Sequence, residues 1–259
     1  MKWNWQHPDW PNFTYEAGEL ADAEATFLRQ GGMLAGAFKH LRPGDEEELV
    51  VEVATSEAMT TSAIEGEMLD RQSVRSSVLR HLGISSDRRS GPREDGIAGL
   101  MTDIIFGEDS GLPHERLWRW HSLVMQGRSG LQRVGAYREH IDPMRIVSGP
   151  IGRELVHFEA PPSDVVPAEM DRFVAWFART RARLPAVTRS GLAHVYFESI
   201  HPFEDGNGRV GRAISELALA QGLGARSLTL LATEIESRQR DYYAHLEQVS
   251  QGLEVTEWL

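Results

Sequence analysis

The residues best suited to chemistry lie together at positions 201–212, which read His-Pro-Phe-Glu-Asp-Gly-Asn-Gly-Arg-Val-Gly-Arg. Because a residue before proline is disfavoured in a right-handed helix, we expect a helix to end before Pro202. Gly206 and Gly208 allow a tight, left-handed backbone path, and a helix is predicted to restart near Arg209. A loop that feeds a helix N-terminus directs several N–H groups at one point, where the helix dipole is positive. The segment therefore predicts an anion nest.

The side chains around this nest suit phosphate transfer. Arg209 and Arg212 are three residues apart, so they share a helix edge and can reach neighbouring phosphates. Asp205 offers a hard oxygen ligand for Mg²⁺, which a polyphosphate would bring with it. His201 stands at the entrance of the loop and can take a proton from an attacking hydroxyl near neutral pH. Phe203 is expected to anchor the loop in the core.

Three other interpretations of the same segment are weaker. Residues 206–211 satisfy the G-x-G-x-x-G pattern of dinucleotide sites, but that pattern needs a preceding strand and an acidic residue about 20 positions later. Residues 205–208 resemble a calcium loop without the ligand series of an EF-hand. A plain Gly/Asn turn between helices leaves a histidine, an aspartate and two arginines around it unexplained.

Residues 201–212 resemble the Fic family signature, H-x-F-x-[D/E]-G-N-G-R-x-x-R, at every specified position. The resemblance implies an α-helical domain that transfers AMP from Mg·ATP to a hydroxyl side chain of a protein. It implies that His201 is the general base, that Asp205 holds Mg²⁺ and that Arg212 faces the γ-phosphate. The implied ATP-binding set within the stretch is Asp205, Gly206, Asn207, Gly208, Arg209, Val210, Gly211 and Arg212.

The resemblance also implies finer roles in the stretch. The backbone of residues 206–208 would hold the α- and β-phosphates, and Arg209 would hold phosphate as well. Relatives with lysine at the position of Gly208 can bind the nucleotide reversed and phosphorylate. Glycine at this position therefore favours adenylylation.

A second match lies about 140 residues upstream, where Thr61-Ser-Ala-Ile-Glu65-Gly66 is similar to the inhibitory pattern of the family, [S/T]-x-x-x-E-[G/N]. We expect Glu65 to form a bidentate pair with Arg212 and to occupy the fork meant for the γ-phosphate. ATP would then bind without its productive geometry. A glutamate near a helix end is usually solvated, but the family's order of motifs favours the inhibitory role here.

Two further segments are placed by the resemblance. The strand at 154–158, with Val156 and His157, stands where the family has a flap that lines the ATP site and pairs by backbone with an extended target segment. An ordinary edge hairpin is the alternative. Tyr243 lies on a helix where relatives have residues close to adenine, with core packing of Tyr242 and Tyr243 as an equal alternative.

The elements that must position these residues are predominantly helical. Apolar residues at spacings of three and four predict helices over 46–64, from an N-cap at Asp70 to Gly83, and from Pro113 towards Gly127. The same periodicity returns around 170–177, 192–196, 214–218 and 242–249. Residues 85–95 read as a polar loop. Extended runs at 145–150 and 154–159 predict a hairpin. The fold class is mainly α, a Fic-type helical bundle with one β-hairpin flap.

Three parts are expected along the chain. Residues 1–45 are rich in aromatic side chains, predict an ordered extension that covers part of the body, and resemble an N-terminal extension of bacterial Fic proteins. Residues 46–110 form a helical segment with the inhibitory helix, and residues 111–259 form the catalytic core. The last residues, 257–259, read as a continuing helix without a cap, which suggests a truncated chain.

Composition excludes several classes of function. The chain has 27 Lys and Arg against 38 Asp and Glu, a net charge of −11, which disfavours broad binding to nucleic acid or to anionic membranes. It has no cysteine, so disulfides and thiolate sites are excluded. Neither a secretory signal nor an apolar run long enough to span a membrane is present. We expect a cytoplasmic protein, either a monomer or a homodimer.

The sequence thus predicts a self-inhibited adenylyltransferase that uses ATP and Mg²⁺, modifies a Ser, Thr or Tyr hydroxyl of a protein target or of itself, and docks that target at the hairpin flap. Two alternatives stay open. In the first, Glu65 positions water and the enzyme removes AMP. In the second, the chain is a nucleotide-sensing binding module that acts through protein contacts.

Overall fold

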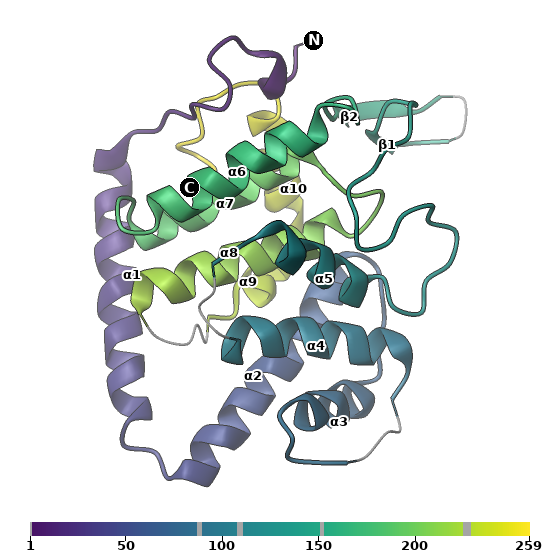
Figure 1. Ribbon diagram of the computed structural model, residues 1–259. Helices are drawn as coiled ribbons and strands as arrows, with labels where there is room; N and C mark the ends of the chain where they lie inside the picture. The colour runs from purple at the N-terminus through teal and green to yellow at the C-terminus, as the bar shows by residue number, and fades with distance from the viewer. Residues whose placement is uncertain (1, 87–89, 108–110, 151–152, 225–228) are drawn as a thin grey trace.

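The computed structural model describes residues 2–86, 90–107, 111–150, 153–224 and 229–259. Over these residues the chain forms ten α-helices and one two-stranded antiparallel sheet (Figure 1). The predicted fold class, mainly α with one hairpin, is therefore confirmed. Among the described helices, none combines the length and the apolar character that a membrane crossing requires.

The elements follow one another as a short 3₁₀ turn (Asn4–Gln6), α1 (Ala17–Phe38), α2 (Pro43–Ile64), α3 (Arg71–His81), α4 (Pro92–Phe106), α5 (His114–Val124), β1 (Arg145–Ser148), β2 (Leu155–Glu159), α6 (Val166–Thr180), α7 (Ala186–Ile200), α8 (Asn207–Leu223), α9 (Leu231–Ser237) and α10 (Gln239–Val249). Figure 1 shows α7 and α8 at the centre, with α6 on one side and α4 and α5 on another.

Three residues that the sequence marks as helix ends, Gly66, Asp70 and Pro113, stand at helix ends in the structure. Asp70 caps α3, because its carboxylate accepts a hydrogen bond from the Ser73 N–H at 2.8 Å. Gly66, at φ +76°, lets the chain turn away directly after α2. α5 follows Pro113 as predicted.

Two expectations about elements are wrong, and one helix has no counterpart among the expectations. α4 begins at Pro92, inside the predicted loop 85–95, because the polar residues there form its first turn: proline suits that position, and Glu94 and Asp95 favour the positive end of the helix dipole. α1, a helix of 22 residues, was not predicted within 1–45. Residues 257–259 do not continue a helix, since α10 ends at Val249.

The N-terminal segment and the C-terminal segment are paired with each other. Thr14 N–H donates to Leu253 O at 2.8 Å, and Val255 N–H donates to Thr14 O at 2.9 Å. The buried Asn4 side chain donates to Ser199 Oγ of α7 at 2.7 Å and to Val249 O of α10 at 3.1 Å. The first residues of the chain are therefore held against α7, α10 and the C-terminal segment.

The hydrophobic core surrounds α7 and α8. Twelve of the fifteen residues of α7 are buried, which fits a helix that is apolar or small on nearly every face. The largest fully buried apolar side chains come from α4, α5, α6, α7 and the loop after α7: Leu100, Leu117, Trp120, Met170, Phe173, Phe177, Tyr196, Phe197, Ile200 and Phe203. Because Phe203 belongs to this core, the core supports the loop between α7 and α8.

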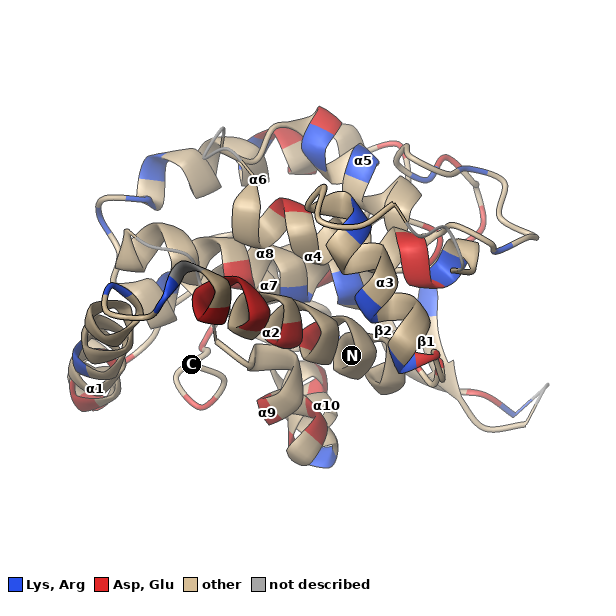
Figure 2. Cartoon of the chain, turned by 90° about the horizontal axis from the view of Figure 1, so that it is seen from below, with Lys and Arg blue, Asp and Glu red and all other residues tan. Residues whose placement is uncertain are grey.

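Acidic residues gather along α2 (Figure 2), and two of them pair with arginines of α3. Arg75 donates to Glu48 at 2.7 Å and to Glu52 at 3.1 Å, and Arg71 donates to Glu52 at 2.5 Å. These pairs are largely exposed, so each is worth little to stability. These ion pairs lie on the side of α2 that is turned away from the core.

Candidate active site

The loop between α7 and α8 follows the tight path that its sequence predicts. His201 adopts the left-handed conformation (φ 49°, ψ 60°), which is unusual for a residue with a side chain, and Gly206 adopts it again (φ 78°, ψ 5°). α8 begins at Asn207, two residues before the predicted start. The Asn207 side chain folds back and binds both the N–H and the C=O of Phe203 at 2.9 Å. This asparagine therefore fastens the loop with its side chain.

Phe203 anchors the loop, as predicted. Its buried ring stacks on His121 of α5, with ring centroids 4.1 Å apart and planes 3° from parallel. Gly135 N–H donates to His121 Nδ1 at 2.9 Å. Burial lowers the pKa of His121 to about 4, so the ring is neutral at pH 7 and serves as an apolar platform.

Arg138 holds the same loop from the other side. Its buried guanidinium donates to His201 O at 2.8 Å and to Pro161 O at 2.6 Å, and its backbone N–H donates to Pro202 O at 2.9 Å. Burial lowers the pKa of Arg138 to about 10, which still leaves it charged at pH 7. Sequence reasoning missed this residue, because it lies in an irregular segment 63 residues before His201.

A cavity of about 660 Å³ opens at this loop, a size typical of small-molecule sites. It brings together the start of α8, the end of α2, the hairpin and α10. The predicted site residues that line it are Glu65, His157, His201, Asp205, Gly206, Asn207, Gly208, Arg212 and Tyr243. Thr61, Gly66, Val156, Arg209, Val210 and Gly211 lie outside the lining, and Val210 is buried in the core.

His201 lies on this cavity next to a carboxylate that is only 12% exposed. Its Nδ1 is 3.5 Å from Glu198 Oε2, one turn back on α7. Burial alone would raise the pKa of Glu198, but the contact with His201, together with the charge of Arg212, outweighs it and lowers the pKa. The carboxylate is therefore charged at neutral pH and faces the imidazole. No pattern in the sequence marks Glu198.

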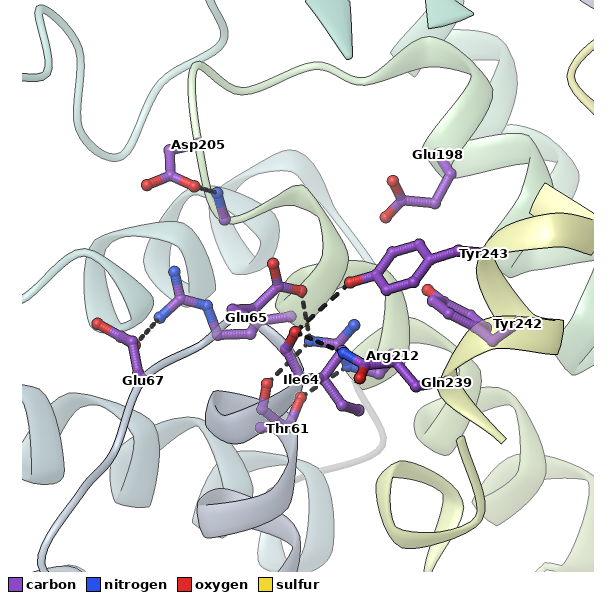
Figure 3. Close-up of polar contacts among 12 residues, drawn as sticks. Thr61, Ile64, Glu65, Glu67, Glu198, Asp205, Arg212, Gln239, Tyr242 and Tyr243 are labelled. Atoms are coloured by element: carbon purple, nitrogen blue, oxygen red, sulfur yellow. Dashed lines mark hydrogen bonds and ion pairs between the residues drawn. The ribbon is translucent and has the colours of Figure 1, made fainter. Parts of the chain in front are cut away.

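Arg212 is held by the end of α2 (Figure 3). Its Nη2 donates to Glu65 Oε1 at 2.8 Å and to Thr61 O at 3.0 Å, and its Nε donates to Thr61 Oγ1 at 2.8 Å. The predicted pairing of Glu65 with Arg212 is present, but the expected bidentate geometry is wrong. Thr61 takes the Nε–H, so the guanidinium is divided between two residues of the inhibitory motif.

Gly208 makes room for that contact. A Cβ atom at this position would lie 2.4 Å from Glu65 Oε1 and 3.2 Å from Arg212 Nη1. The Glu65 carboxylate thus sits against the first turn of α8, where the helix dipole favours a negative charge. An internal carboxylate occupies the place that the sequence assigns to phosphate.

α10 braces the same end of α2. Gln239 Nε2 donates to Ile64 O at 3.1 Å, and the Tyr243 hydroxyl donates to it at 3.5 Å (Figure 3). Tyr242 is buried, with its hydroxyl 2.9 Å from His194 Nε2, so it packs in the core. Tyr243 is 45% exposed and lines the cavity. Tyr242 therefore fits the core-packing interpretation, and the contact of Tyr243 with adenine stays a prediction.

Asp205 stands at the mouth of the nest with its side chain 47% exposed. Its Oδ1 accepts from Gly206 N–H at 2.6 Å, and its Oδ2 accepts from Arg128 Nη1 at 2.9 Å. Within the described ranges, no group of three or more His, Asp or Glu side chains is arranged to hold a metal. A lone carboxylate fits Mg²⁺, which binds through one or two carboxylates together with phosphate oxygens and water.

Arg209 is turned away from the cavity. Its Nη1 donates to Glu67 Oε2 at 2.6 Å, and the arginine side chain is only 3% exposed. Glu67 follows the inhibitory motif by one residue, and sequence reasoning missed it, as it missed Arg128.

The hairpin lies beside the cavity and is tied to α10. β1 and β2 pair antiparallel with Val147 opposite Val156 and an irregularity after Ile146. His157 Nε2 is 2.6 Å from Ser148 Oγ, and its Nδ1 is 3.2 Å from Glu247 Oε1 of α10. The four residues of β1 are exposed. The flap role of the hairpin stays a prediction.

Comparison with known proteins places this geometry in a family. A family model described as the Fic/DOC family matches residues 111–219, which include the whole 201–212 segment. The chain carries a Fic domain. A second model, described as a domain of unknown function (DUF4172), matches residues 3–84. Glu65 and Thr61 therefore lie outside the Fic match and inside the second one.

Solved Fic proteins share the fold. A Fic family protein from Desulfovibrio desulfuricans G20 is 26% identical with a TM-score of 0.66, and the match covers 91% of this chain and 69% of that one. A Fic domain containing signaling protein from Bacteroides thetaiotaomicron VPI-5482 is 17% identical with a TM-score of 0.63, and the match covers 85% of this chain and 81% of that one. Fic-1 from C. elegans is 19% identical with a TM-score of 0.63, and the match covers 90% and 67%.

A curated relative carries a functional name. The Aquifex aeolicus (strain VF5) protein named "Probable protein adenylyltransferase aq_aa38" is 35% identical over 95 residues. That match covers 37% of this chain and 27% of the relative. The match thus spans about a quarter of the length of the Aquifex protein.

Proposed function

We propose that this Fic-domain protein is a self-inhibited protein adenylyltransferase. It would transfer AMP from Mg·ATP to a Ser, Thr or Tyr hydroxyl of a protein, itself included. The observation that carries the proposal is the single cavity that holds His201, the N-terminus of α8 and an arginine occupied by an internal carboxylate. The name of the Aquifex relative supports the same reaction class.

Each residue of the site has a separate role in the proposed reaction. His201 accepts the proton of the attacking hydroxyl, whose oxygen forms a bond to the α-phosphorus of ATP. The bond from that phosphorus to the bridging oxygen breaks, and pyrophosphate leaves with the electron pair. The backbone N–H groups at the start of α8 and the guanidinium of Arg212 stabilise the charge that grows on the phosphates. Mg²⁺ bound through Asp205 would neutralise part of that charge.

Inhibition follows from what Arg212 binds. A charge-assisted hydrogen bond to Glu65 and two hydrogen bonds to Thr61 occupy the donors that would face the γ-phosphate. The Glu65 carboxylate also adds a negative charge where a triphosphate must enter. ATP then has to displace the carboxylate or bind without its productive geometry.

The target would dock at the hairpin. β1 and β2 form a sheet of two strands, so each strand has a free edge for an extended segment to join. His157 and Phe158 of β2 lie on the cavity, which would bring a hydroxyl from such a segment towards His201.

The test is labelling with ATP that carries the label on either the α- or the γ-phosphate. We expect Glu65→Gly to incorporate the α-label into protein, including itself, at least about tenfold faster than the parent chain, because a lost charge-assisted hydrogen bond is worth about 1.5–3 kcal/mol. The γ-label should stay in solution. Glu65→Gly combined with His201→Ala is the matched control, which should bind ATP and transfer nothing.

The same variant separates the other functions. Equal labelling by Glu65→Gly and the parent chain would contradict the inhibitory role of Glu65, and incorporation of the γ-label would indicate phosphorylation instead.

Removal of AMP is the second candidate, because Glu65 shares the cavity with His201 and is placed to orient water. In that case Glu65→Gly loses activity on a target that already carries AMP. A nucleotide-sensing module would bind ATP and label no protein of a cell lysate.

A further inference from the structure

The ring of His201 has one buried nitrogen to which the signature assigns no partner. His201 Nδ1 is buried and makes no hydrogen bond to any residue that the structure describes. The backbone of the same residue is held on both sides, because its N–H donates to Phe197 O at 2.9 Å and its C=O accepts from Arg138 Nε at 2.8 Å. The fold thus fixes the backbone of His201 and leaves the ring to be oriented through Nδ1.

The carboxylate of Glu198 stands beside this nitrogen. Its Oε2 lies 3.5 Å from His201 Nδ1, and both residues line the cavity. Its other oxygen, Oε1, is buried and has no hydrogen-bond partner within the described part of the chain. A buried carboxylate costs free energy unless a donor or a positive charge compensates it. A ring nitrogen without a partner therefore faces a carboxylate that needs one.

One glycine of α8 makes room for this carboxylate. A Cβ atom on Gly211 would lie 2.6 Å from Glu198 Oε1 and 3.5 Å from the ring of Phe197. Because α7 packs closely against α8, a side chain at position 211 would take the space that the carboxylate occupies. Gly211 is not a fixed position of the signature. The structure shows that this glycine lets Glu198 lie between the two helices, next to His201.

The other charged and titratable groups near Glu198 are engaged elsewhere. Arg212 is bound by the end of α2 and stands apart from Glu198 in Figure 3. His194 and Tyr242 are hydrogen-bonded to each other at 2.9 Å, and the Tyr243 hydroxyl donates to α2. Burial raises the pKa of Glu198, but its contact with the imidazole and the charge of Arg212 outweigh burial, so the carboxylate is charged at neutral pH.

We propose that Glu198 is the positioning residue for His201. The carboxylate holds a proton on Nδ1, which leaves Nε2 free to accept the proton of the attacking hydroxyl. After that transfer Nε2 carries the proton, the Nδ1–H stays with Glu198, and the carboxylate stabilises the imidazolium without taking up a proton itself. The 3.5 Å separation suits this role, because hydrogen bonds of catalytic groups are often long without substrate and shorten when it binds.

Nitrogen-15 NMR of the chain, labelled in its histidines, tests where the proton lies and needs no transfer reaction. We expect the neutral ring of His201 to carry its proton on Nδ1 in the parent chain. In Glu198→Gln this preference should be lost, because an amide can either accept from Nδ1 or donate to it. The His201 signals are assigned by their loss in His201→Ala.

Glu169→Gln is the matched control. The Glu169 side chain is 12% exposed, as that of Glu198 is, but it lies outside the lining of the cavity. This variant removes the same charge from an equally covered carboxylate. It should keep the proton of His201 on Nδ1 and should leave the rate of transfer unchanged.

Kinetics in the Glu65→Gly background separate positioning from binding. We expect Glu198→Gln to lower kcat about tenfold and to leave the KM for ATP within about twofold, because a neutral amide stabilises the imidazolium less than a carboxylate does. Gly211→Ala should also lower kcat, since it displaces the carboxylate. Combined with Glu198→Ala, which empties that space, Gly211→Ala should cause no further loss.

The proposal is overturned if His201 of the parent chain carries its proton on Nε2. It is also overturned if folded Glu198→Gln, as judged by its melting temperature, keeps the Nδ1 proton and the full kcat, or loses activity only through KM. This role for Glu198 rests on the proposed function for the reaction that His201 serves. A change of proton position in Glu198→Gln without label transfer by Glu65→Gly would reject the proposed function and leave the positioning of His201 standing.

Discussion

Gly208 occupies a point where inhibition and nucleotide binding compete for the same space. It lies in the first turn of α8, and the Glu65 carboxylate approaches so closely that a Cβ atom would stand 2.4 Å from Oε1. The atom in the way is the end of a flexible side chain, so a methyl group can push it aside without disturbing the backbone. A phosphate in the nest would meet the same methyl group.

Gly208→Ala should therefore leave the fold intact and weaken ATP binding. Alanine is a better helix former than glycine, so we expect the free energy of unfolding to change by less than about 1 kcal/mol. We also expect calorimetry to show ATP affinity reduced by at least about tenfold, since one displaced phosphate contact to a helix N-terminus is worth more than 1.4 kcal/mol. Unchanged ATP affinity in a folded Gly208→Ala protein would show that the phosphates lie elsewhere.

At the residue scale, the sequence revealed groups that stand together in one signature. His201, Asp205 and Arg212 are separated by a few residues, so their types and spacing indicate the chemistry directly. The residues it missed act across the chain: Glu67 binds Arg209 over 142 positions, and Arg138 binds His201 over 63. A contact between distant residues leaves no local pattern, and only the fold brings the partners together.

At the scale of elements, a carboxylate from another helix caps the N-terminus of α7. Glu24 of α1 accepts from Thr188 N–H at 2.6 Å, from Thr188 Oγ1 at 2.7 Å and from Val187 N–H at 3.1 Å. These N–H groups are among the four that a helix N-terminus leaves free. The contact caps the helix that carries His201 and joins α1 to the core.

Glu24→Ala should destabilise the protein through the start of α7. We expect the free energy of unfolding to fall by about 2 kcal/mol, since a lost N-cap costs about 1 kcal/mol and buried N–H groups are left unsatisfied. Urea denaturation measures the change. Asp22→Ala is the control, because Asp22 is exposed on the same helix. Equal losses in the two variants would assign the effect to α1 itself and not to the cap.

Elements were predictable where their own residues signal the ends. The Asp70 cap and the Gly66 turn mark α3 and the end of α2 in the sequence. α1 could not be recognised from the sequence for two reasons. Its buried polar residue, Glu24, accepts hydrogen bonds from the N-terminus of α7 and not from its own helix, and few of its apolar side chains reach the core. The start of α4 could not be recognised from the sequence, because acidic residues such as Glu94 and Asp95 are as typical of a polar loop as of a first helical turn. Only the position of Pro92 at the start of the helix distinguishes the two.

At the scale of the whole molecule, buried histidines tie the helices together. His194 of α7 lies between Ser215 of α8, at 3.0 Å, and Tyr242 of α10, at 2.9 Å. His121 of α5 supports the active-site loop through Phe203. Burial lowers the pKa of each histidine to about 4, so both are neutral in the folded protein down to that pH.

The unfolded chain takes up these protons near the ordinary histidine pKa of about 6.5, while the folded protein does not. The unfolded state therefore binds more protons between pH 6.5 and pH 4, and stability must fall as the pH falls through this range. Each histidine should cost on the order of 2 kcal/mol at pH 5 relative to pH 7. Glu198, whose pKa is lowered, loses its contribution only as the pH falls below the ordinary carboxylate range.

Urea unfolding of the parent chain and of His194→Gln at pH 7 and pH 5 measures this effect. We expect the parent chain to lose more stability than the variant between the two pH values, by about 2 kcal/mol, although the variant starts lower because its hydrogen bonds change. Glu57, whose pKa burial raises, acts in the opposite direction but equally in both proteins, so the comparison isolates His194. An identical loss in both proteins would mean that His194 takes up its proton without unfolding, and that the joint of α7, α8 and α10 tolerates a buried charge.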